Sequence, residues 1–424
     1  MEATYNKDRI SEMPEEIVDQ ILSLLPARDA VRMSVLSKTW QQVSKKLLPP
    51  VVSFIFGKDF FKENSTYKLF EWNMRHTIPK KEHDRLLKLV DESLSKALVQ
   101  NKNKVIVQKF QLSLPFPVTM VRKVASHVNR WLSTLVTRNT VDLLQIHFDE
   151  CYHDFVEKLV LDVGRLMLRG VIMRKGLLGD DSRKLFCLRE LSLDFIYIQD
   201  AKVLNDMLSR CPLLESIILR GIFNGDKDFG ILQLCNFPKL KNVDINNVSG
   251  FSRIHIQVPN LELLKFSYLD WMELPIFCSV HLVKHLWIDY DIIATYPFID
   301  KLISQIPVIE SLFLENLKVD PRLRALEISS QHLKRLAMHF VTIEGQEGVI
   351  NIHAPYLYGY SFKGIQVPTL HYTNFSCLQE VDLVLRPRNL DTLWFINLRK
   401  KLAVFDGLEA DVTVTIDPFS WVRL

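Results

Sequence analysis

The chain has 424 residues, 48% hydrophobic and 24% charged, which is enough apolar material for two or three compact units or one elongated repeat array. Its 53 basic and 49 acidic residues leave a net charge of +4, too small to indicate nucleic acid or a membrane surface as the main partner. No run approaches the roughly 18 apolar residues of a spanning helix, and the N-terminus lacks an apolar signal core. Because the six cysteines form no CxxC pair, we expect a reduced compartment, the cytoplasm or the nucleus or both.

Residues 8–40 are typical of a compact helical unit. Ser11 is a suitable N-cap for a first helix, which Pro26 ends, and Asp29 can cap a second helix. Three short helices in about 35 residues cannot bury all their apolar surface among themselves, and such a surplus indicates a partner-binding module. The first helix carries an apolar stripe at Ile17, Ile21, Leu22 and Leu25, and the second is expected to turn Val31, Val35 and Leu36 inward.

The segments of this unit have a characteristic order: Arg9-Ile10-Ser11, Met13-Pro14-Glu15-Glu16-Ile17, Ile21-Leu22-Ser23-Leu24-Leu25-Pro26, Asp29-Ala30-Val31-Arg32 and Val35-Leu36-Ser37-Lys38-x-Trp40. That order resembles the F-box of the plant F-box/leucine-rich-repeat proteins. The resemblance implies docking onto a Skp-type adaptor, which bridges to a cullin and a RING protein. The positions that match the docking positions of the family are Pro14, Ile17, Ile21, Leu22, Leu25, Leu36 and Trp40.

Two residues of this unit depart from the family's pattern. Met13 stands where the family usually has Leu, a change of similar volume. Thr39 stands where the family usually has Arg before the Trp, so one charged docking contact is expected to be missing. The alternative is a helical subdomain that only caps the end of a repeat array.

Residues 49–105 are expected to connect this unit to the rest of the chain. They contain a predicted strand at 51–56, a loop-rich basic stretch at 57–81, an amphipathic helix at 84–98 and a turn at 100–104.

Beyond residue 105 the chain repeats a template, L-x-x-L-x-L, in which Ile, Val, Phe, Met or Tyr can replace Leu. The last members of successive copies lie 21 to 26 residues apart, within the range of leucine-rich repeats. Nine copies follow one another: Leu188/Leu191/Leu193, Leu214/Ile217/Leu219, Leu240/Val243/Ile245, Leu261/Leu264/Phe266, Val283/Leu286/Ile288, Ile309/Leu312/Leu314, Leu333/Leu336/Met338, Leu357/Tyr360/Phe362 and Leu378/Val381/Leu383.

The repeats predict an α/β solenoid with a curved parallel sheet on its concave side and helices and loops outside. Weaker copies are expected at 107–112, 141–146 and 156–161, with helices at 121–138, 201–208 and 298–303. The predicted organisation is therefore an F-box at 1–48, a connecting segment at 49–105, and a repeat array at 106–424 that residues 412–416 close with a last strand. Too little sequence follows Leu383 to assign a full domain of the FBD type, which many plant relatives carry.

No catalytic constellation is evident, so we expect no enzyme, no cofactor and no metal site. His281 and His285 lie four residues apart but lack the intervening Glu of a zinc helix. Cys187, Cys211 and Cys235 recur at the repeat period, which indicates buried small residues at turns. Phosphate-binding glycine motifs are absent from the sequence.

The residue between the last two apolar positions of each template is expected to face the concave side, because side chains alternate along a strand. Trp287 and Phe313 would stand side by side on adjacent strands, about 5 Å apart. With Asp289 and Glu315 beside them, they have the composition of an interface hot spot for a basic target segment. The alternative is that the aromatic pair packs on a neighbouring loop or on the C-terminal tail.

The main functional hypothesis is a substrate adaptor of a Skp–cullin–F-box ubiquitin ligase, whose partners are the Skp-type subunit and an unknown target protein. The first alternative is a co-receptor that holds a hormone or another small molecule within the repeats. It would require a basic pocket, and Arg220, Lys241, Arg253 and Lys265 are too scattered to form one. The second alternative is a repeat scaffold with a degenerate F-box.

Overall fold

The computed structural model describes residues 13–24, 33, 35–47, 51–57, 59–60, 63, 80–100, 106–114, 121–138, 140–148, 153–154, 163–173, 187–225, 230–267, 276–277, 281–289, 293–294, 303, 305–319, 325–343, 349–372, 377–387, 390–406 and 409–417. The chain divides into two compact units, Met1–Tyr197 and Ile198–Leu424. Within the described residues, no helix is both long enough and apolar enough to cross a membrane.

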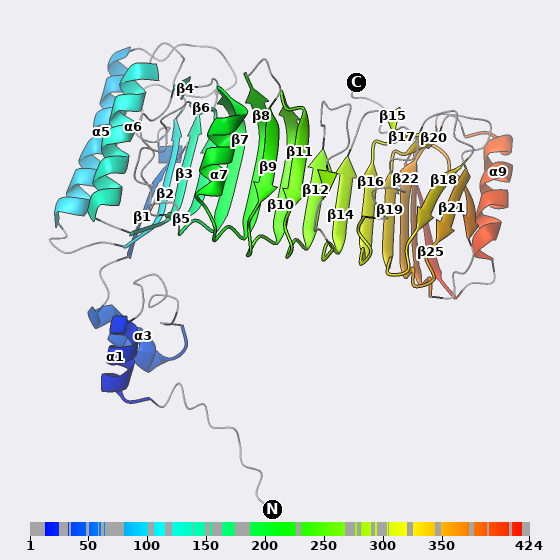
Figure 1. Ribbon diagram of the computed structural model, residues 1–424, viewed down its shortest axis with the longest axis horizontal. Helices are drawn as coiled ribbons and strands as arrows, with labels where there is room; N and C mark the ends of the chain where they lie inside the picture. The colour runs from blue at the N-terminus through cyan, green and yellow to red at the C-terminus, as the bar shows by residue number, and fades with distance from the viewer. Residues whose placement is uncertain are drawn as a thin grey trace, which may run out of the picture. The chain divides into compact units, whose positions relative to one another are not determined.

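The first unit begins with a small helical module, residues 13–47, which contains α1 (Glu15–Leu24) and α3 (Lys38–Leu47) (Figure 1). Ser37 caps α3, since its Oγ accepts a hydrogen bond from the Trp40 amide at 3.3 Å. Among the described residues, the core of the module contains Val18, Leu22, Trp40 and Val43. Met13, Ile21 and Met33 pack against this core and are partly buried.

The same unit contains parallel strands in the order β1 (Val51–Phe56), β2 (Ile106–Leu114), β3 (Thr140–Phe148), β5 (Val163–Arg169) and β7 (Glu190–Ile198). Two long helices, α5 (Lys80–Gln100) and α6 (Val121–Arg138), lie beside each other (Figure 1). A further short pair is formed by β4 (His153–Asp154) and β6 (Val171–Met173). One register row of this sheet is wholly apolar and buried: Phe54, Phe110, Leu144, Leu166 and Leu191.

The sequence predicted several of these elements. The strand at 51–56 and the helix at 121–138 are confirmed, and α5 extends beyond the predicted 84–98 at both ends. The strand expected at 156–161 lies outside the described residues. The strand that pairs with β3 is β5, whose Val163, Leu166 and Leu168 repeat the same spacing seven residues later. Because both segments fit the template, spacing alone could not choose between them.

Residues 51–56, predicted as part of a connecting segment, form the first strand of this sheet, because β1 pairs with β2 from Val51↔Ile106 to Phe56↔Leu112. The predicted domain boundaries at residues 48 and 105 stay predictions.

In the second unit, parallel strands follow in the order β8 (Ser216–Asn224), β10 (Asn242–Ser249), β12 (Leu263–Ser267), β14 (His285–Asp289), β16 (Ser311–Glu315), β19 (Arg335–His339), β22 (Gly359–Gly364), β24 (Glu380–Leu385) and β25 (Asp411–Ile416). The repeat template is confirmed here, because its apolar positions stand in register and are buried from β8 to β24. The predicted last strand is also present as β25.

The last strand of this sheet, β25, leaves its apolar side chains exposed to solvent. Val412, Val414 and Ile416 of β25 pair in register with buried residues of β24, yet they are 40%, 36% and 38% exposed. The helix α9 (Thr392–Leu402), followed by the short helix η3 (Ala403–Phe405), has no buried side chain.

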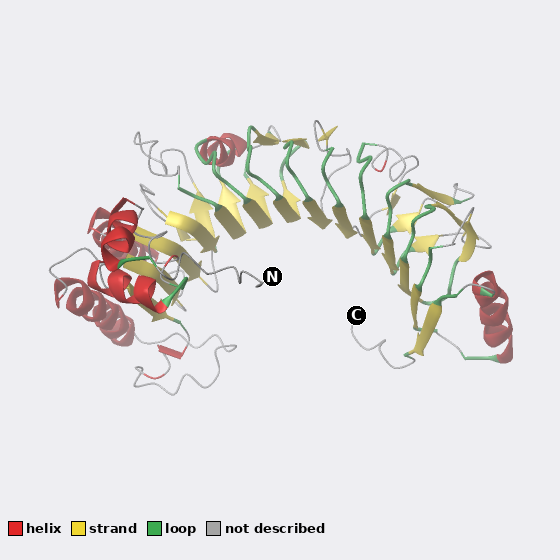
Figure 2. Ribbon diagram, turned by 90° about the horizontal axis from the view of Figure 1, so that it is seen from below, coloured by secondary structure: helices red, strands yellow, loops and turns green. Residues whose placement is uncertain are grey.

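The outer layer of the second unit differs from the expected helices. Figure 2 shows the long strands along the inner side of a curve, with shorter elements outside. The predicted helix at 201–208 is present as α7 (Ala201–Ser209), capped by Asp200, whereas the one at 298–303 lies outside the described residues except for the helical Ile303. In the described part of the outer layer, the remaining strands form three small parallel sheets: β9 (Ile231–Cys235), β11 (Arg253–Gln257) and β13 (Ile276–Phe277); β15 (Ile293–Ala294), β17 (Lys318–Val319) and β20 (Thr342–Ile343); and β18 (Leu326–Ser329), β21 (Val349–His353) and β23 (Thr369–Tyr372).

These outer strands are consistent with the local sequence. Segments such as Ile231–Cys235 and Arg253–Gln257 alternate exposed and buried side chains with period two, and they stack one on the next from repeat to repeat. A segment of five residues is too short for a stable helix but can pair with its neighbours as a strand.

Candidate binding surfaces

The helical module separates the predicted docking residues into two groups. Pro14, Ile17 and Leu36 are exposed, Ile17 at 47% and Leu36 at 40%. Leu22 and Trp40 lie instead in the core of the module, with Trp40 only 1% exposed, and Ile21 packs partly buried against that core. The side chains of Leu22 and Trp40 therefore hold the module together and offer almost no surface to a partner. Leu25 lies outside the described residues.

Val35 is a surface residue that the sequence analysis missed. It was expected to point inward with Leu36, but it is 84% exposed. The expectation was wrong because Val35 and Leu36 lie in a turn before the Ser37 cap of α3, not on the inner face of a helix. The signal was present in the sequence, since a serine directly before a helical stretch marks a helix start.

The inner face of the second unit brings Trp287 and Phe313 together as predicted. They are register partners on β14 and β16, with ring centroids 5.2 Å apart and ring planes at 20°. Residues on either side of each ring along the strand are buried, so both rings stand on the inner face of a packed sheet. Stacked aromatic pairs of this kind contribute about 0.5–1.5 kcal/mol beyond the area that they bury.

Lys265 changes what the Trp287 ring can offer to a partner. Its Nζ lies 4.0 Å from the centroid of that ring, and it comes from β12, on the side opposite to Phe313. The two faces of the Trp287 ring are therefore occupied, one by Lys265 and the other by Phe313. Trp287 Nε1 is buried and has no hydrogen-bond partner within the described part of the chain.

Two carboxylates lie next to the aromatic pair. Asp289 and Glu315 are register partners, one row beyond the rings. Asp289 Oδ1 accepts a hydrogen bond from Asn316 Nδ2 at 2.8 Å. On the next strand stands His339, whose pKa is lowered below its usual 6.5, chiefly because burial disfavours the charged imidazolium. These groups make the inner face acidic around the pair, with a neutral imidazole beside it near pH 7.

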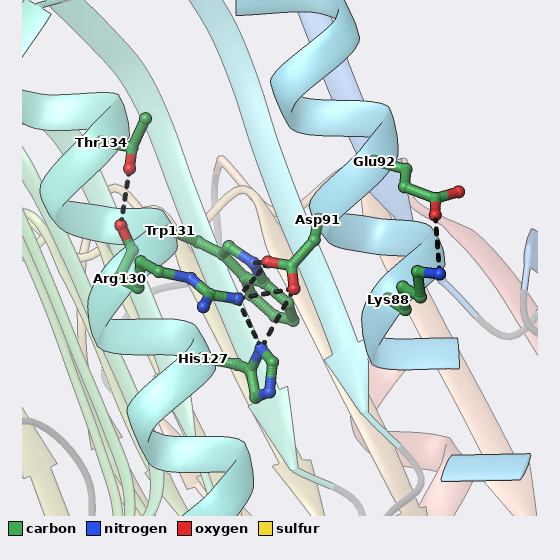
Figure 3. A network of polar contacts seen from close by, with 7 residues as sticks. All are labelled: Lys88, Asp91, Glu92, His127, Arg130, Trp131 and Thr134. Carbon is green, nitrogen blue, oxygen red and sulfur yellow. Dashed lines mark hydrogen bonds and ion pairs between the residues drawn. The ribbon is translucent and has the colours of Figure 1, made fainter. Parts of the chain in front are cut away.

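A polar network on the outer helices could be mistaken for a catalytic set (Figure 3). The Asp91 carboxylate of α5 accepts hydrogen bonds from Arg130 Nη2 and from Trp131 Nε1 of α6, and His127 Nδ1 lies 3.3 Å from it. All three α6 groups are directed at one carboxylate, and Trp131 is otherwise buried. The network therefore ties α5 to α6, and the sequence offered no signal for it because the pairs lie 36 to 40 residues apart.

The cysteine prediction holds for one residue of the three. Cys211 is fully buried after α7, where its Sγ donates to the Met207 carbonyl at 3.2 Å, and burial raises the pKa of its thiol to about 12. Cys235 is half-buried and Cys187 is exposed, so burial at the turn is not a property of every repeat. In the described ranges, no three metal-ligating side chains come together.

Parallel strands stacked at a period of 21 to 26 residues, each with a buried L-x-x-L-x-L template, define the class of leucine-rich-repeat proteins, here with an N-terminal helical module. The sequence model of the family described as "At1g61320/AtMIF1, LRR domain" matches residues 98–362, and that of the F-box domain matches residues 10–50. The chain belongs to this LRR-domain family and carries an F-box domain. The resemblance that the sequence motifs indicated is thereby confirmed.

Similar proteins from Arabidopsis thaliana have the same combination of domains in their names. F-box/FBD/LRR-repeat protein At4g00160 is 26% identical over 277 residues, which are 64% of this chain and 53% of that protein. F-box/LRR-repeat protein At5g35995 is 26% identical over 335 residues, or 73% and 64% of the two chains. F-box/LRR-repeat protein At3g26922 is 29% identical over 272 residues, or 63% and 78%. The chain thus spans between half and two thirds of the length of the first two relatives.

Proposed function

We propose that the chain is a substrate adaptor of a Skp–cullin–F-box ubiquitin ligase and acts in the cytoplasm or the nucleus. The F-box match supports this proposal, because F-box domains in general bind a Skp-type subunit, which connects them to a cullin and a RING protein. F-box and leucine-rich-repeat domains are binding domains, so the chain contributes to ubiquitination without a catalytic residue of its own.

The observation that carries the proposal is apolar surface that stays exposed on a module with a packed core. In the described part of the module, Val18, Leu22, Trp40 and Val43 pack in the core, whereas Ile17, Val35 and Leu36 are exposed. Three large apolar side chains on so small a module favour a protein partner over solvent. Pro14, directly before α1, is a further exposed apolar residue and lies three positions before Ile17 in the sequence.

The second interface is the inner face of the repeats, where Trp287, Phe313, Asp289 and Glu315 form the candidate substrate surface. The mechanism is proximity: a target held by the repeats and a ubiquitin-charged enzyme held through the F-box share one complex. The target lysine then meets the ubiquitin thioester at a high effective concentration.

Co-purification with a plant Skp-type subunit tests the proposal. The double variant Ile17→Asp/Val35→Asp places two charges on exposed positions and is expected to abolish binding while the module stays folded. Gln42→Asp on α3 is the control for a new charge at an exposed position, and the single variants Ile17→Asp and Val35→Asp, which add one charge each, are compared with it. Leu22→Asp is unsuitable, since it would bury a charge in the core and unfold the module.

Failure of the intact, folded chain to bind any Skp-type subunit would contradict the proposal. Thr39, which replaces the usual Arg of the family, would then mark a degenerate F-box on a repeat scaffold. Equal loss of binding in Gln42→Asp would show that the apolar surface is not what the subunit recognises.

A further inference from the structure

The strand β25 ends its sheet with an exposed edge. It pairs with β24 on one side, and among the described strands it has no neighbour on the other side. All six of its residues are exposed. Proteins usually protect such an edge from pairing with other strands by charged side chains, proline or a bulge. From Val412 to Ile416 the strand contains no charged residue and no proline, and its register with β24 is uninterrupted.

The backbone groups that point to the open edge follow from the pairing with β24. The amide of Asp411 donates to the Gln379 carbonyl at 2.8 Å, and the amide of Asp417 donates to the Leu385 carbonyl at 2.9 Å. Successive residues of a strand direct their N–H and C=O groups to alternate sides, so the odd-numbered residues between these two also face β24. The N–H and C=O groups that point to the open edge therefore belong to the even-numbered residues: Val412, Val414 and Ile416.

The sequence of β25 is symmetric about Val414. In both directions from Val414, a threonine comes first and a β-branched apolar residue comes second. Antiparallel pairing of two copies about Val414 places Val414 opposite its own counterpart, Thr413 opposite Thr415, and Val412 opposite Ile416. Each residue whose backbone groups point to the open edge then meets another such residue, and each of these pairs exchanges two hydrogen bonds. Threonine pairs and pairs of β-branched residues across strands stabilise a sheet.

The same register brings the exposed apolar side chains of two copies together. Val414 is the register partner of the buried Leu383 of β24, and Val412 and Ile416 lie on the same side of the sheet. Directly opposite residues of antiparallel strands also share one face of the sheet, so these side chains contact their counterparts.

Charges at the two ends of β25 do not oppose this register. Asp411 would stand opposite Asp417 of the second copy, which is the one contact between like charges. Arg386 Nη2 lies 3.3 Å from Asp417 Oδ2 and offsets the repulsion between the two carboxylates.

We propose that β25 is a dimerisation edge, through which two copies of the chain pair antiparallel about Val414. A second copy fits better than an unrelated strand, because the residue types and the free backbone groups of β25 are both symmetric about one residue. A strand pair is a small interface, so the dimer is expected to form at micromolar concentrations and to dissociate in dilute solution, where β25 is exposed. The inference goes beyond the proposed function and does not depend on it.

Sedimentation velocity of the full chain over a concentration series tests the dimer. The chain is expected to change from one copy to two as its concentration rises. Val414→Lys places two like charges opposite each other at the centre of the pair and should weaken the dimer by roughly tenfold. Leu263→Lys is the matched control: Leu263 is 39% exposed, against 36% for Val414, but β12 has a neighbouring strand on each side.

Cysteine variants test the register. In Val414→Cys the two introduced thiols belong to directly opposite residues, whose Cα atoms lie about 5.5 Å apart, within the range of a disulfide. Val412→Cys is the control on the same strand and the same face, because position 412 is about 13 Å along the strand from its own counterpart. Mild oxidation should cross-link the Val414→Cys chain, while the Val412→Cys chain should stay at the background of the unmodified sequence.

A chain that stays monomeric throughout the series would overturn the inference, as would a dimer that survives Val414→Lys or equal cross-linking of the two cysteine variants. Growth beyond two copies would also overturn it, because such growth indicates head-to-tail pairing of unlike surfaces. The substitutions leave the F-box module unaltered, so none of these outcomes bears on the binding of a Skp-type subunit.

Discussion

At the scale of single residues, position in the helical module determines whether an apolar side chain stabilises the fold or is available to a partner. Trp40 and Leu22 were predicted as docking residues from a family pattern, which records which residues recur but not which way they point. Their burial and the exposure of Ile17 and Val35 come from the packing of α1 against α3, which the sequence alone does not specify.

This difference predicts the cost of two substitutions. Trp40→Ala should lower the free energy of unfolding of the module by about 3–5 kcal/mol, because it leaves a cavity in the core. Ile17→Ala, at an exposed position, should change it by no more than about 0.5 kcal/mol. Hydrogen exchange of the amides of residues 13–47 in the full chain measures both values, and similar costs would contradict the assignment of core and surface.

The cysteines predict a selective chemical modification. With a pKa of about 12, the buried thiol of Cys211 has a thiolate fraction on the order of 10⁻⁴ at pH 8. Cys187 is exposed. Treatment of the folded chain with iodoacetamide should therefore modify Cys187 and spare Cys211, as peptide mapping by mass spectrometry can determine. Rapid modification of Cys211 in the folded chain would contradict its burial.

His339 predicts a dependence of stability on pH. Burial, together with the nearby charge of Lys363, lowers the pKa of its imidazole in the folded state, and these effects outweigh the opposite effect of Glu315 and Asp382. The unfolded chain therefore binds the proton more readily, so stability is complete above about pH 6.5 and falls as the pH drops below that value. An NMR titration should give a midpoint below 6.5, and His339→Gln should weaken the loss of stability in acid. A midpoint at or above 6.5 would contradict the prediction.

At the scale of elements, the sequence predicted the inner strands well and the outer layer poorly. Positions such as Leu312 and Leu314 are constrained by burial, so their spacing recurs in every copy and reveals the strand. The outer segments satisfy only local contacts and vary in length, which leaves no shared pattern. Segments of two to five residues that stack as strands were missed where helices and loops had been expected.

The candidate surface on the inner face was predicted in part for the same reason. The register of the templates placed Trp287 beside Phe313 correctly, because a strand fixes which side chains are neighbours. The position of Lys265 over Trp287 could not be predicted, since the flexible lysine side chain can adopt many rotamers.

The open end of the repeats predicts a contrast between two register partners. Leu383 of β24 is fully buried, whereas Val414, its partner on β25, is 36% exposed. Leu383→Ala should destabilise the array by about 2–5 kcal/mol, and Val414→Ala by less than about 1 kcal/mol. Chemical unfolding of the purified chain measures the difference. A large cost at Val414 would mean that further structure covers β25 in solution.

At the scale of the whole molecule, two interfaces are assigned to two parts of the chain. The F-box module presents apolar surface for a Skp-type subunit, and the repeats present an aromatic and acidic inner face for a target. Both assignments are proposals for a chain that spans between half and two thirds of the length of the Arabidopsis proteins At4g00160 and At5g35995. Because the two assignments involve different residues, variants of one interface are expected to leave binding at the other unchanged.

Hydrogen exchange of the chain with and without a plant Skp-type subunit tests this division of roles most directly. Protection is expected in the module, at the peptides that contain Ile17 and Val35–Leu36, with no change in β14 and β16. Absence of a complex, or protection on β14 and β16 instead of the module, would contradict the proposal that the F-box module is the docking site.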